Sequence, residues 1–431
     1  MGDVILEYLS AATEGQAVVA TEADAVDRMP ARWVARPGST EQTAAVMRIA
    51  ADHDLAVVVR GSGTKLTWGS APERLDLVLD TTRMDAVVEH AAGDLIVVVG
   101  AGRRLDDLQA DLAGSRQWLA VEPSRRGTVG GVVATAATGP TRLLHGPVRD
   151  LLIGVTIVRA DGVVAHSGGK VVKNVAGYDV GKLLTGSFGT LGVITQTAFR
   201  LHPLPESRRW VLVPVGRSDA GGTPQDIRAL VQQVVHSQLV PTAVELDRPA
   251  TGDATLCLLL EGIPPGVESR TADALDLLGA GATASDEAPQ WWGAEPLVGG
   301  AEPQNGDEVL LKVTHEIDGL AHLLTALDDA CAATGLVAHL RGSVAVGAVT
   351  VGLSGGSDAY ALVRFVASLR ERAPVFGGTV VVLDTHSDLT ADLKADLDVW
   401  GPVGGLELMR AVKHQFDPER RLAPGRFVGG I

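Results

Sequence analysis

The stretch EPSRRGTVGGVVATAA, residues 122–137, is the most informative part of the chain, because only Val, Ala and Thr follow its last glycines. Such a loop lets its backbone approach a large flat ligand or another stretch of backbone closely. A second glycine loop, RGSGTKL at residues 60–66, follows an apolar run, and its N–H groups can converge on an anion such as a diphosphate. For residues 60–66 alone, a simple tight turn is an equal alternative.

A third glycine-rich tract runs from NVAGYD at residues 174–179 to GSFGTLG at residues 186–192. Three such tracts in one region predict an extended cleft for a dinucleotide. Neither of the first two loops is a G-x-G-x-x-G motif that enters a helix, so a Rossmann-type NAD site is disfavoured.

The composition excludes several classes of protein. The chain has 431 residues, 51 of them Gly, but only seven Trp, three Tyr and six Phe. Its formal net charge of −15 disfavours a nucleic-acid partner, because the phosphates would be repelled. Cys257 and Cys331 are its only cysteines and form no CxxC pair, which rules out thiolate zinc sites and iron–sulfur clusters.

The N-terminal residues do not resemble a signal peptide, because they carry no basic segment and Glu7 interrupts their apolar run. No stretch approaches the roughly 18 uncharged apolar residues that a membrane-spanning helix needs. We therefore expect a cytoplasmic protein without a transmembrane segment, while peripheral membrane association through partner subunits stays open.

The patterning predicts two regions of mixed α and β structure that meet near Pro205. In the first, β-branched runs alternate with glycine turns, and Ser39 or Thr40 would cap a helix over residues 40–53. In the second, the predicted strands cover residues 210–215, 254–260, 309–313, 345–353 and 379–383. The predicted helices there cover residues 224–237, 271–278, 320–334 and 357–372. Residues 281–305 are predicted to be a loop, and residues 406–416 a helix.

The glycine tracts resemble the FAD-binding domain of the vanillyl-alcohol oxidase and p-cresol methylhydroxylase (PCMH) superfamily, and within it the FAD-binding subunits of bacterial glycolate oxidases. The resemblance is dense over residues 37–205 and returns at Lys413 and in APGR, residues 423–426. It implies an α+β protein in which residues 1–205 form a two-subdomain PCMH-type FAD-binding domain. Residues 206–392 would form an α+β cap domain with an antiparallel sheet, and residues 393–431 would pack back on the FAD site.

The resemblance also implies which residues bind FAD. Residues 61–66 and 127–135 would cradle the diphosphate, residues 191–195 would lie along the adenosine end, and Tyr178 and Arg426 would approach the isoalloxazine. The full set is Arg60, Gly61, Ser62, Gly63, Thr64, Lys65, Leu66, Pro123, Gly127, Thr128, Val129, Gly130, Gly131, Ala134, Thr135, Gly139, Arg142, Gly177, Tyr178, Gly192, Val193, Ile194, Gly425 and Arg426. Because Thr64 stands where relatives that tether the flavin carry a histidine, we expect FAD to be bound non-covalently.

Oxidation of a 2-hydroxy acid by a flavin needs a cation for the carboxylate and a base for the hydroxyl. The candidates for the cation are Lys312, Arg341 and Arg426, and those for the base are His315, His339 and Tyr178. Related dehydrogenases bind a divalent metal through clustered histidines. Residues 339–344 offer a single histidine and no carboxylate, so we predict no metal site.

Three functions therefore stay open. The leading one is an FAD-dependent oxidoreductase subunit that oxidises a small 2-hydroxy acid, of the glycolate or D-lactate type, and passes electrons to partner subunits of a glycolate-oxidase-like complex. The second is an FAD-binding assembly or electron-relay subunit without turnover of its own. The third is a stand-alone oxidase of a sugar or polyol.

Overall fold

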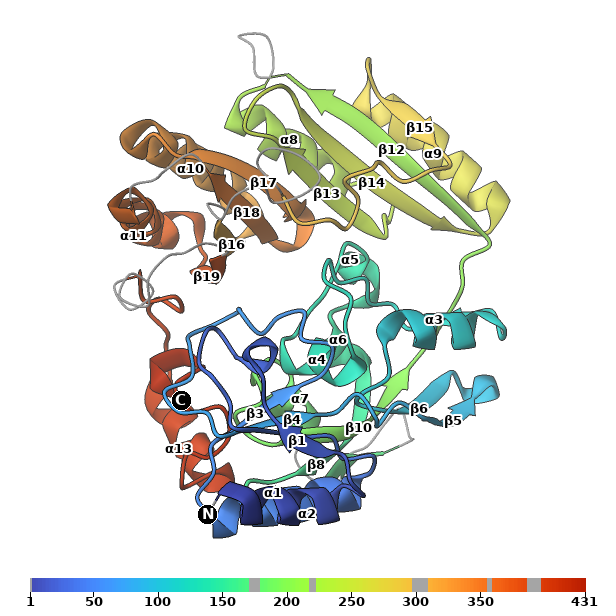
Figure 1. The fold of residues 1–431 in the computed structure, drawn as a ribbon. Coiled ribbons are helices and arrows are strands. Elements are labelled where there is room, and N and C mark those ends of the chain that lie inside the picture. The colour runs from blue at the N-terminus through green and yellow to red at the C-terminus, as the bar shows by residue number, and fades with distance from the viewer. Residues whose placement is uncertain (1, 170–178, 217–221, 297–308, 355–358, 386–396) are drawn as a thin grey trace. The chain divides into compact units, whose positions relative to one another are not determined.

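The computed structural model describes residues 2–169, 179–216, 222–296, 309–354, 359–385 and 397–431 (Figure 1). The chain divides into two compact units. Unit 1 consists of Met1–Thr138, Gly146–Leu204 and Pro402–Ile431, and unit 2 of Gly139–His145 and Pro205–Gly401. The α+β class expected from the sequence is confirmed.

Unit 1 contains a sheet of four short strands in the order β1 (Ala17–Val19), β2 (Trp33–Ala35), β4 (Leu77–Asp80) and β3 (Val57–Arg60). Strands β2, β4 and β3 are parallel, so their carboxyl ends meet at one edge of the sheet. Helices α1 (Gly2–Ala12) and α2 (Thr40–Asp52) bury their apolar faces in the core beside this sheet. The predicted helix over residues 40–53 is confirmed, with Ser39 as its N-cap: the Ser39 hydroxyl accepts the N–H of Gln42 at 3.2 Å.

A second sheet of unit 1 is antiparallel, in the order β5 (Val87–Ala91), β6 (Ile96–Gly100), β10 (Val193–Arg200), β8 (Leu152–Val158) and β9 (Val164–Gly168). Strands β7 (Gln117–Trp118) and β11 (His202–Pro203) form a separate pair. The helices α3 (Leu105–Ala113), α4 (Val129–Ala134), α6 (Val148–Leu151) and α7 (Val180–Leu184) contribute to the same core as this sheet, in which Leu108 and Phe199 are fully buried.

The last part of unit 1 is tied to its core through helix α13 (Leu406–Phe416) and the residues after it. The ammonium of Lys413 is buried and donates to the carbonyls of Thr190 and Leu422, each at 2.8 Å, and to Asp417 at 2.7 Å. Strand β3 adds two backbone hydrogen bonds to this connection. The N–H of Val57 donates to the carbonyl of Arg421, and the carbonyl of Val57 accepts the N–H of Ala423. The buried ammonium of Lys413 therefore has three hydrogen-bond partners.

Unit 2 is built on one antiparallel sheet of eight described strands. Their order is β15 (Thr283–Ser285), β12 (Ser207–Val215), β14 (Ala254–Gly262), β13 (Ala243–Arg248), β17 (Val337–Ser343), β18 (Ala348–Ser354), β16 (Val309–Thr314) and β19 (Val380–Thr385). The helices α8 (Pro224–Val235), α9 (Pro264–Leu278), α10 (Leu320–Thr334) and α11 (Ala359–Phe376) bury one face of the sheet in a large apolar core. Short helix α5 (Arg142–His145) belongs to this unit and contacts β13.

The sequence did not predict β13 or β17. Polar residues alternate along one face of each strand, so neither strand contains the apolar run used to predict the others. The predicted strand over residues 345–353 begins later, at Ala348, because a 3-10 turn at Val344–Val346 ends on Gly347 with φ +67°. Strand β15 lies inside the predicted loop over residues 281–305, of which residues 297–305 are outside the described ranges.

No helix in the described ranges combines the length and the apolar character needed to cross a lipid bilayer.

Candidate functional site

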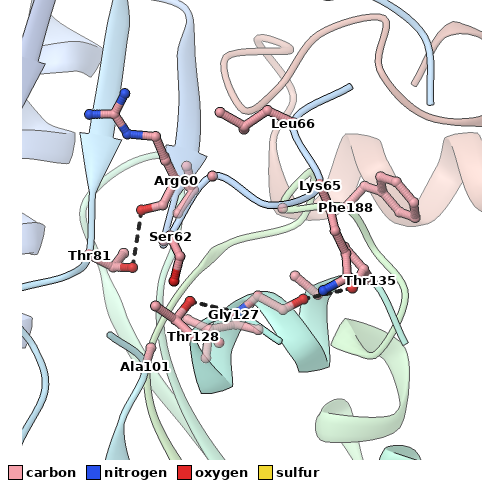
Figure 2. A pocket seen from close by; sticks show the side chains of 18 of the residues that line it. Arg60, Ser62, Lys65, Leu66, Thr81, Ala101, Gly127, Thr128, Thr135 and Phe188 are labelled. Carbon is pink, nitrogen blue, oxygen red and sulfur yellow. Dashed lines mark hydrogen bonds between the residues drawn. The ribbon is translucent and has the colours of Figure 1, made fainter. Parts of the chain in front are cut away.

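Unit 1 contains a pocket to whose wall three glycine-rich segments contribute (Figure 2). Its lining comes from the end of β3 with the loop that follows, from the start of α4, and from the turn before β10. These residues are Val58, Val59, Arg60, Gly61, Ser62, Gly63, Thr64, Lys65, Leu66, Thr81, Ala101, Gly127, Thr128, Gly130, Gly131, Ala134, Thr135, Phe188, Gly189, Gly192, Ile194 and Arg426. The three glycine tracts singled out in the sequence thus meet in one place.

The first two glycine loops interlock. A Cβ placed on Gly61 would lie 2.0 Å from Oγ1 of Thr128, and one on Gly127 would lie 2.9 Å from Oγ1 of Thr64. The ammonium of Lys65 spans the same loops, donating to the carbonyl of Arg125 at 2.7 Å. Because glycine is the only residue without a Cβ, these positions explain why both loops need it.

The pocket suits a dinucleotide that binds through its diphosphate. Seven glycines line it, so backbone rather than bulky side chains borders the space. The hydroxyl of Ser62 is buried and has no hydrogen-bond partner among the described residues. A hydroxyl in that state can donate to a ligand, and backbone N–H groups of glycine loops do the same for anions. The residues present therefore fit FAD.

Arg426 stabilises the loop after residue 66. Its guanidinium donates to the carbonyls of Leu66 at 2.8 Å and Trp68 at 2.7 Å. Burial lowers the pKa of Arg426 to about 10, although the charge of Asp27 opposes that shift. The guanidinium therefore keeps its positive charge at neutral pH, at the edge of the pocket.

Most of the residues predicted to bind FAD line this pocket, but some do not. Pro123, Val129, Val193 and Gly425 are in unit 1 outside the lining, whereas Gly139 and Arg142 are in unit 2. Gly177 and Tyr178 lie outside the described residues. Sequence reasoning missed Val58, Val59, Thr81, Ala101, Phe188 and Gly189. Val58 and Val59 belong to the apolar run that precedes the first loop, and that run was a sequence signal for them. Thr81 and Ala101 line the pocket only because of tertiary packing.

Unit 2 presents a polar row across four neighbouring strands. The strand register places Asp247 on β13 opposite Arg341 on β17, Arg341 opposite Thr350 on β18, and Thr350 opposite Lys312 on β16. Directly opposed residues share a face of a sheet. The residues next in sequence, among them Leu311, are in the helix-covered core, so the row lies on the other face.

Asp247 is the centre of the hydrogen bonding in this row. One of its oxygens accepts from Nε of Arg341 at 2.8 Å and contacts Nε2 of His339 at 2.7 Å. Burial raises the pKa of Asp247, but the hydrogen bonds from His339 and Arg341 outweigh it, and the pKa lies below its ordinary value. Arg341 also donates to the carbonyls of Ala294 and Glu295, so the loop before residue 297 is tied to the row.

Lys312 differs from Arg341, because its ammonium makes no hydrogen bond or ion pair with another described residue. Burial lowers the pKa of Lys312, and the charge of Arg142 on α5 lowers it further. His315 follows the end of β16 and has a different environment: Nδ1 contacts the carbonyl of Glu316 at 2.7 Å, and Nε2 is buried and has no hydrogen-bond partner in the described part of the chain. Burial lowers the pKa of His315.

The described residues contain no group of three or more His, Cys, Asp or Glu side chains arranged to hold a metal ion.

Comparisons with known proteins point to the same cofactor. Residues 31–168 match the family model described as FAD binding domain. A D-lactate dehydrogenase of Archaeoglobus fulgidus is 28% identical, and the match covers 92% of this chain and 91% of that protein. The glycolate oxidase subunit GlcD of Bacillus subtilis is 31% identical over 50% of this chain and 45% of its own length. Subunit GlcE of Escherichia coli is 34% identical over 35% of this chain and 43% of its own length.

The fold is also found in a solved structure. An alkyldihydroxyacetonephosphate synthase superposes with a TM-score of 0.70 at 15% identity, over 98% of this chain and 86% of that one. At this identity the likeness establishes the fold, which extends through both units.

Proposed function

Because the chain belongs to the FAD-dependent oxidoreductases and carries their FAD binding domain at residues 31–168, we propose that it oxidises a small 2-hydroxy acid, of the glycolate or D-lactate type, and passes electrons to a partner subunit. The names of its relatives support this substrate class, and two of them are subunits of a glycolate oxidase. Bound FAD supplies the acceptor for the hydride that leaves C2 of such an acid.

At the cofactor end, residues 61–66 and 127–135 would hold the diphosphate without a covalent bond. Their glycines bring backbone N–H groups to the pocket, and the unpartnered hydroxyl of Ser62 offers one further donor. Arg426 would keep the chain after residue 66 in place through its two bonds to backbone carbonyls.

At the substrate end, Lys312 is the observation that most supports a carboxylic acid. A buried cation without an anionic partner is unfavourable, and the neighbouring charge of Arg142 adds to the cost. A substrate carboxylate at Lys312 would supply the missing charge. Arg341 suits this role less well, because Asp247 and two carbonyls already occupy its guanidinium.

His339 is the strongest candidate for the base that takes the hydroxyl proton. Its 2.7 Å contact with Asp247, a carboxylate whose pKa is lowered, supports the tautomer with the ring proton on Nε2, whereas Nη2 of Arg341, 3.3 Å from the same nitrogen, opposes it. Nδ1 then carries the lone pair that accepts a proton. Asp247 would act through His339 by fixing this tautomer, as carboxylates commonly do for a catalytic histidine.

Anaerobic spectroscopy tests the proposed function. The purified protein is expected to absorb near 450 nm and to lose that absorbance when glycolate, D-lactate or 2-hydroxyglutarate is added under nitrogen. Loss with a sugar or polyol only, together with hydrogen peroxide formation in air, would instead indicate a stand-alone oxidase. Flavin that no compound in the panel reduces would support an assembly or electron-relay subunit.

Lys312→Met is expected to impair turnover of the acid without loss of FAD. Removing a charged hydrogen bond to the carboxylate should lower kcat/KM by about 10- to 100-fold, mainly through KM. In the unchanged protein, affinity for the acid should fall as the pH rises through the pKa of Lys312, because only the protonated ammonium attracts a carboxylate. Lys182→Met, which removes a partly buried lysine of unit 1 that lies 3.9 Å from Asp150, is the control. Unchanged steady-state constants in Lys312→Met would exclude Lys312 from the site.

A further inference from the structure

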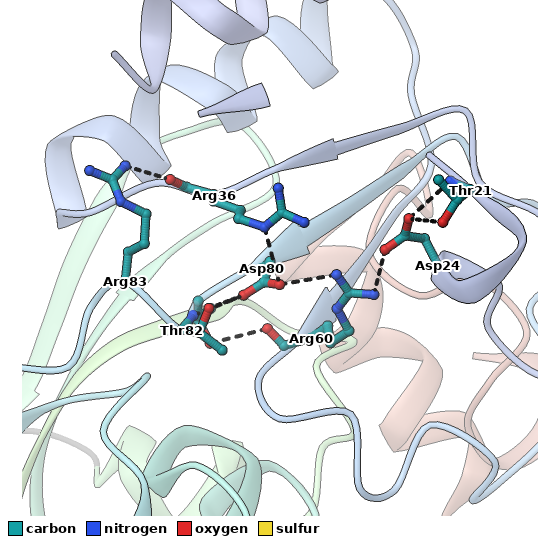
Figure 3. Close-up of polar contacts among 8 residues, drawn as sticks. Thr21, Asp24, Arg36, Arg60, Asp80, Thr82 and Arg83 are labelled. Carbon is teal, nitrogen blue, oxygen red and sulfur yellow. Dashed lines mark hydrogen bonds and ion pairs between the residues drawn. The ribbon is translucent and has the colours of Figure 1, made fainter. Parts of the chain in front are cut away.

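Four charged side chains form a row at the carboxyl ends of the parallel strands of unit 1 (Figure 3). Arg60 ends β3, Asp80 ends β4 directly opposite it, and Arg36 follows β2. Asp24 lies in a 3-10 turn, Glu22–Asp24, at the far end of the row. The guanidinium of Arg60 donates to Asp80 at 3.0 Å and to Asp24 at 2.9 Å, and Arg36 lies 3.7 Å from Asp80.

This row is largely buried, and its charges are balanced. Asp80 is 6% exposed, and the side chains of Arg60 and Asp24 are 13% and 14% exposed. Burial lowers the pKa of Arg60, but the hydrogen bonds that Arg60 donates to Asp24 and Asp80 outweigh this effect, and the pKa lies above its ordinary value. For Asp24, burial raises the pKa of the carboxyl. The hydrogen bonds that the carboxylate accepts from Thr21 and Arg60 outweigh this effect, and the pKa lies below its ordinary value.

Arg60 therefore does not serve the pocket as a free cation. Figure 2 shows its guanidinium pointing away from the two glycine loops, although its backbone lines the pocket. Two carboxylates already neutralise it, so little of its charge remains for a diphosphate. An arginine directly before a glycine loop would otherwise be expected to bind phosphate.

The row is connected to the pocket through the backbone. Thr81, which lines the pocket, donates two hydrogen bonds to the carbonyl of Arg60. Its backbone N–H lies 2.8 Å from that oxygen, and its hydroxyl lies 3.2 Å from it. The other oxygen of Asp80 accepts the N–H of Thr82 at 3.0 Å and its hydroxyl at 2.5 Å. Asp80 thus holds the side chain of Arg60, which directly precedes the loop over residues 61–66. It also holds the turn at Thr82, next to Thr81 of the pocket.

We propose that Asp80 and Arg60 are positioning residues for FAD: their ion pair sets the direction in which the glycine loop leaves β3, and neither side chain touches the cofactor. The inference rests on the part of the proposed function that assigns residues 61–66 to the diphosphate. It predicts that breaking the pair weakens FAD binding. If Arg60 bound the diphosphate directly, freeing its guanidinium would strengthen binding instead.

The test uses the full chain with Asp80→Asn. After FAD removal, the dissociation constant is measured by quenching of flavin fluorescence, well below the melting temperature of the apoprotein. Because one charge-assisted hydrogen bond is lost, we expect the constant to rise by about 10- to 100-fold. The control is Asp54→Asn, which breaks an exposed ion pair with Arg74 in the same unit and should leave FAD binding unchanged.

Three further variants distinguish a positioning role from an effect on stability alone and from direct binding of FAD. Asp24→Asn removes the outer carboxylate only, and it replaces Asp80→Asn if that variant does not fold. Arg60→Met should bind FAD as weakly as Asp80→Asn, and Arg60→Lys, which keeps the charge but pairs with one carboxylate, should recover part of the affinity. A lowered melting temperature with an unchanged or smaller dissociation constant in the aspartate variants would overturn the inference. If the unchanged protein does not bind FAD, the cofactor assignment itself fails.

Discussion

Replacing Gly61 by alanine is expected to give a folded protein that is purified with little or no FAD. The added Cβ would lie 2.0 Å from Oγ1 of Thr128 and 3.0 Å from both its Cβ and its Cγ2. Rotating the threonine cannot relieve three such contacts, so the two glycine loops must separate. Overpacking of this kind costs about 1–3 kcal/mol. If this cost distorts the two loops that hold the diphosphate, FAD affinity should fall by about 10- to 100-fold.

The ratio of absorbance near 450 nm to that at 280 nm measures this effect directly. Gly93→Ala is the matched control in the same unit, because no atom lies within 4 Å of the position of its Cβ. Gly93→Ala should carry as much FAD as the unchanged protein. If Gly61→Ala did so too, the loops would not form the diphosphate site.

Lys413→Met is expected to lower the free energy of unfolding by about 3–5 kcal/mol, the range found when one partner of a buried ion pair is removed. The substitution leaves the carboxylate of Asp417 fully buried beside two carbonyls that have lost their donor. Asp417 keeps the N–H groups of Arg421 and Leu422, which satisfy hydrogen bonds but do not neutralise its charge. Chemical denaturation of unit 1, followed by FAD fluorescence, gives the measurement.

Arg410→Met provides the comparison on the same helix. Arg410 pairs with Glu407 in solvent, and exposed ion pairs of this kind contribute about 0–1 kcal/mol. An effect of Lys413→Met as small as that of Arg410→Met would show that the buried pair does not stabilise the unit.

The pocket of unit 1 that we propose for FAD could be predicted from the sequence because its signal is local. At Gly61 and Gly127 a Cβ would come within 3 Å of a threonine side chain of the other loop, and at Gly130 it would come that close to Ala101; each glycine loop is also recognisable by itself. The assignment of Arg142 shows the limit of such reasoning. Its neighbours in sequence belong to unit 1, but residues 139–145 pack with the sheet of unit 2, where Arg142 faces Lys312.

The polar networks could not be predicted, because they depend on strand register. Asp80 lies 20 residues from Arg60, and Asp247 lies 94 residues from Arg341. Each pair meets only because its two residues stand opposite one another on neighbouring strands. His339 and Arg341 were recognised as separate candidates, but the carboxylate that joins them was not. Alternating polar residues at 245 and 247 were the only sequence signal for that carboxylate.

The interleaving of the two units has a consequence for biosynthesis. A ribosome delivers residues 402–431 only after all of unit 2 has been made, yet Lys413, Leu422 and Arg426 complete the core and the pocket of unit 1. A nascent chain that stops before residue 402 lacks the lysine that bonds to Thr190 and the arginine that holds the loop after Leu66. Binding of FAD is therefore expected to be a late event in maturation, after the sheet of unit 2 has been translated, and FAD is not expected to act as a nucleus around which unit 1 folds.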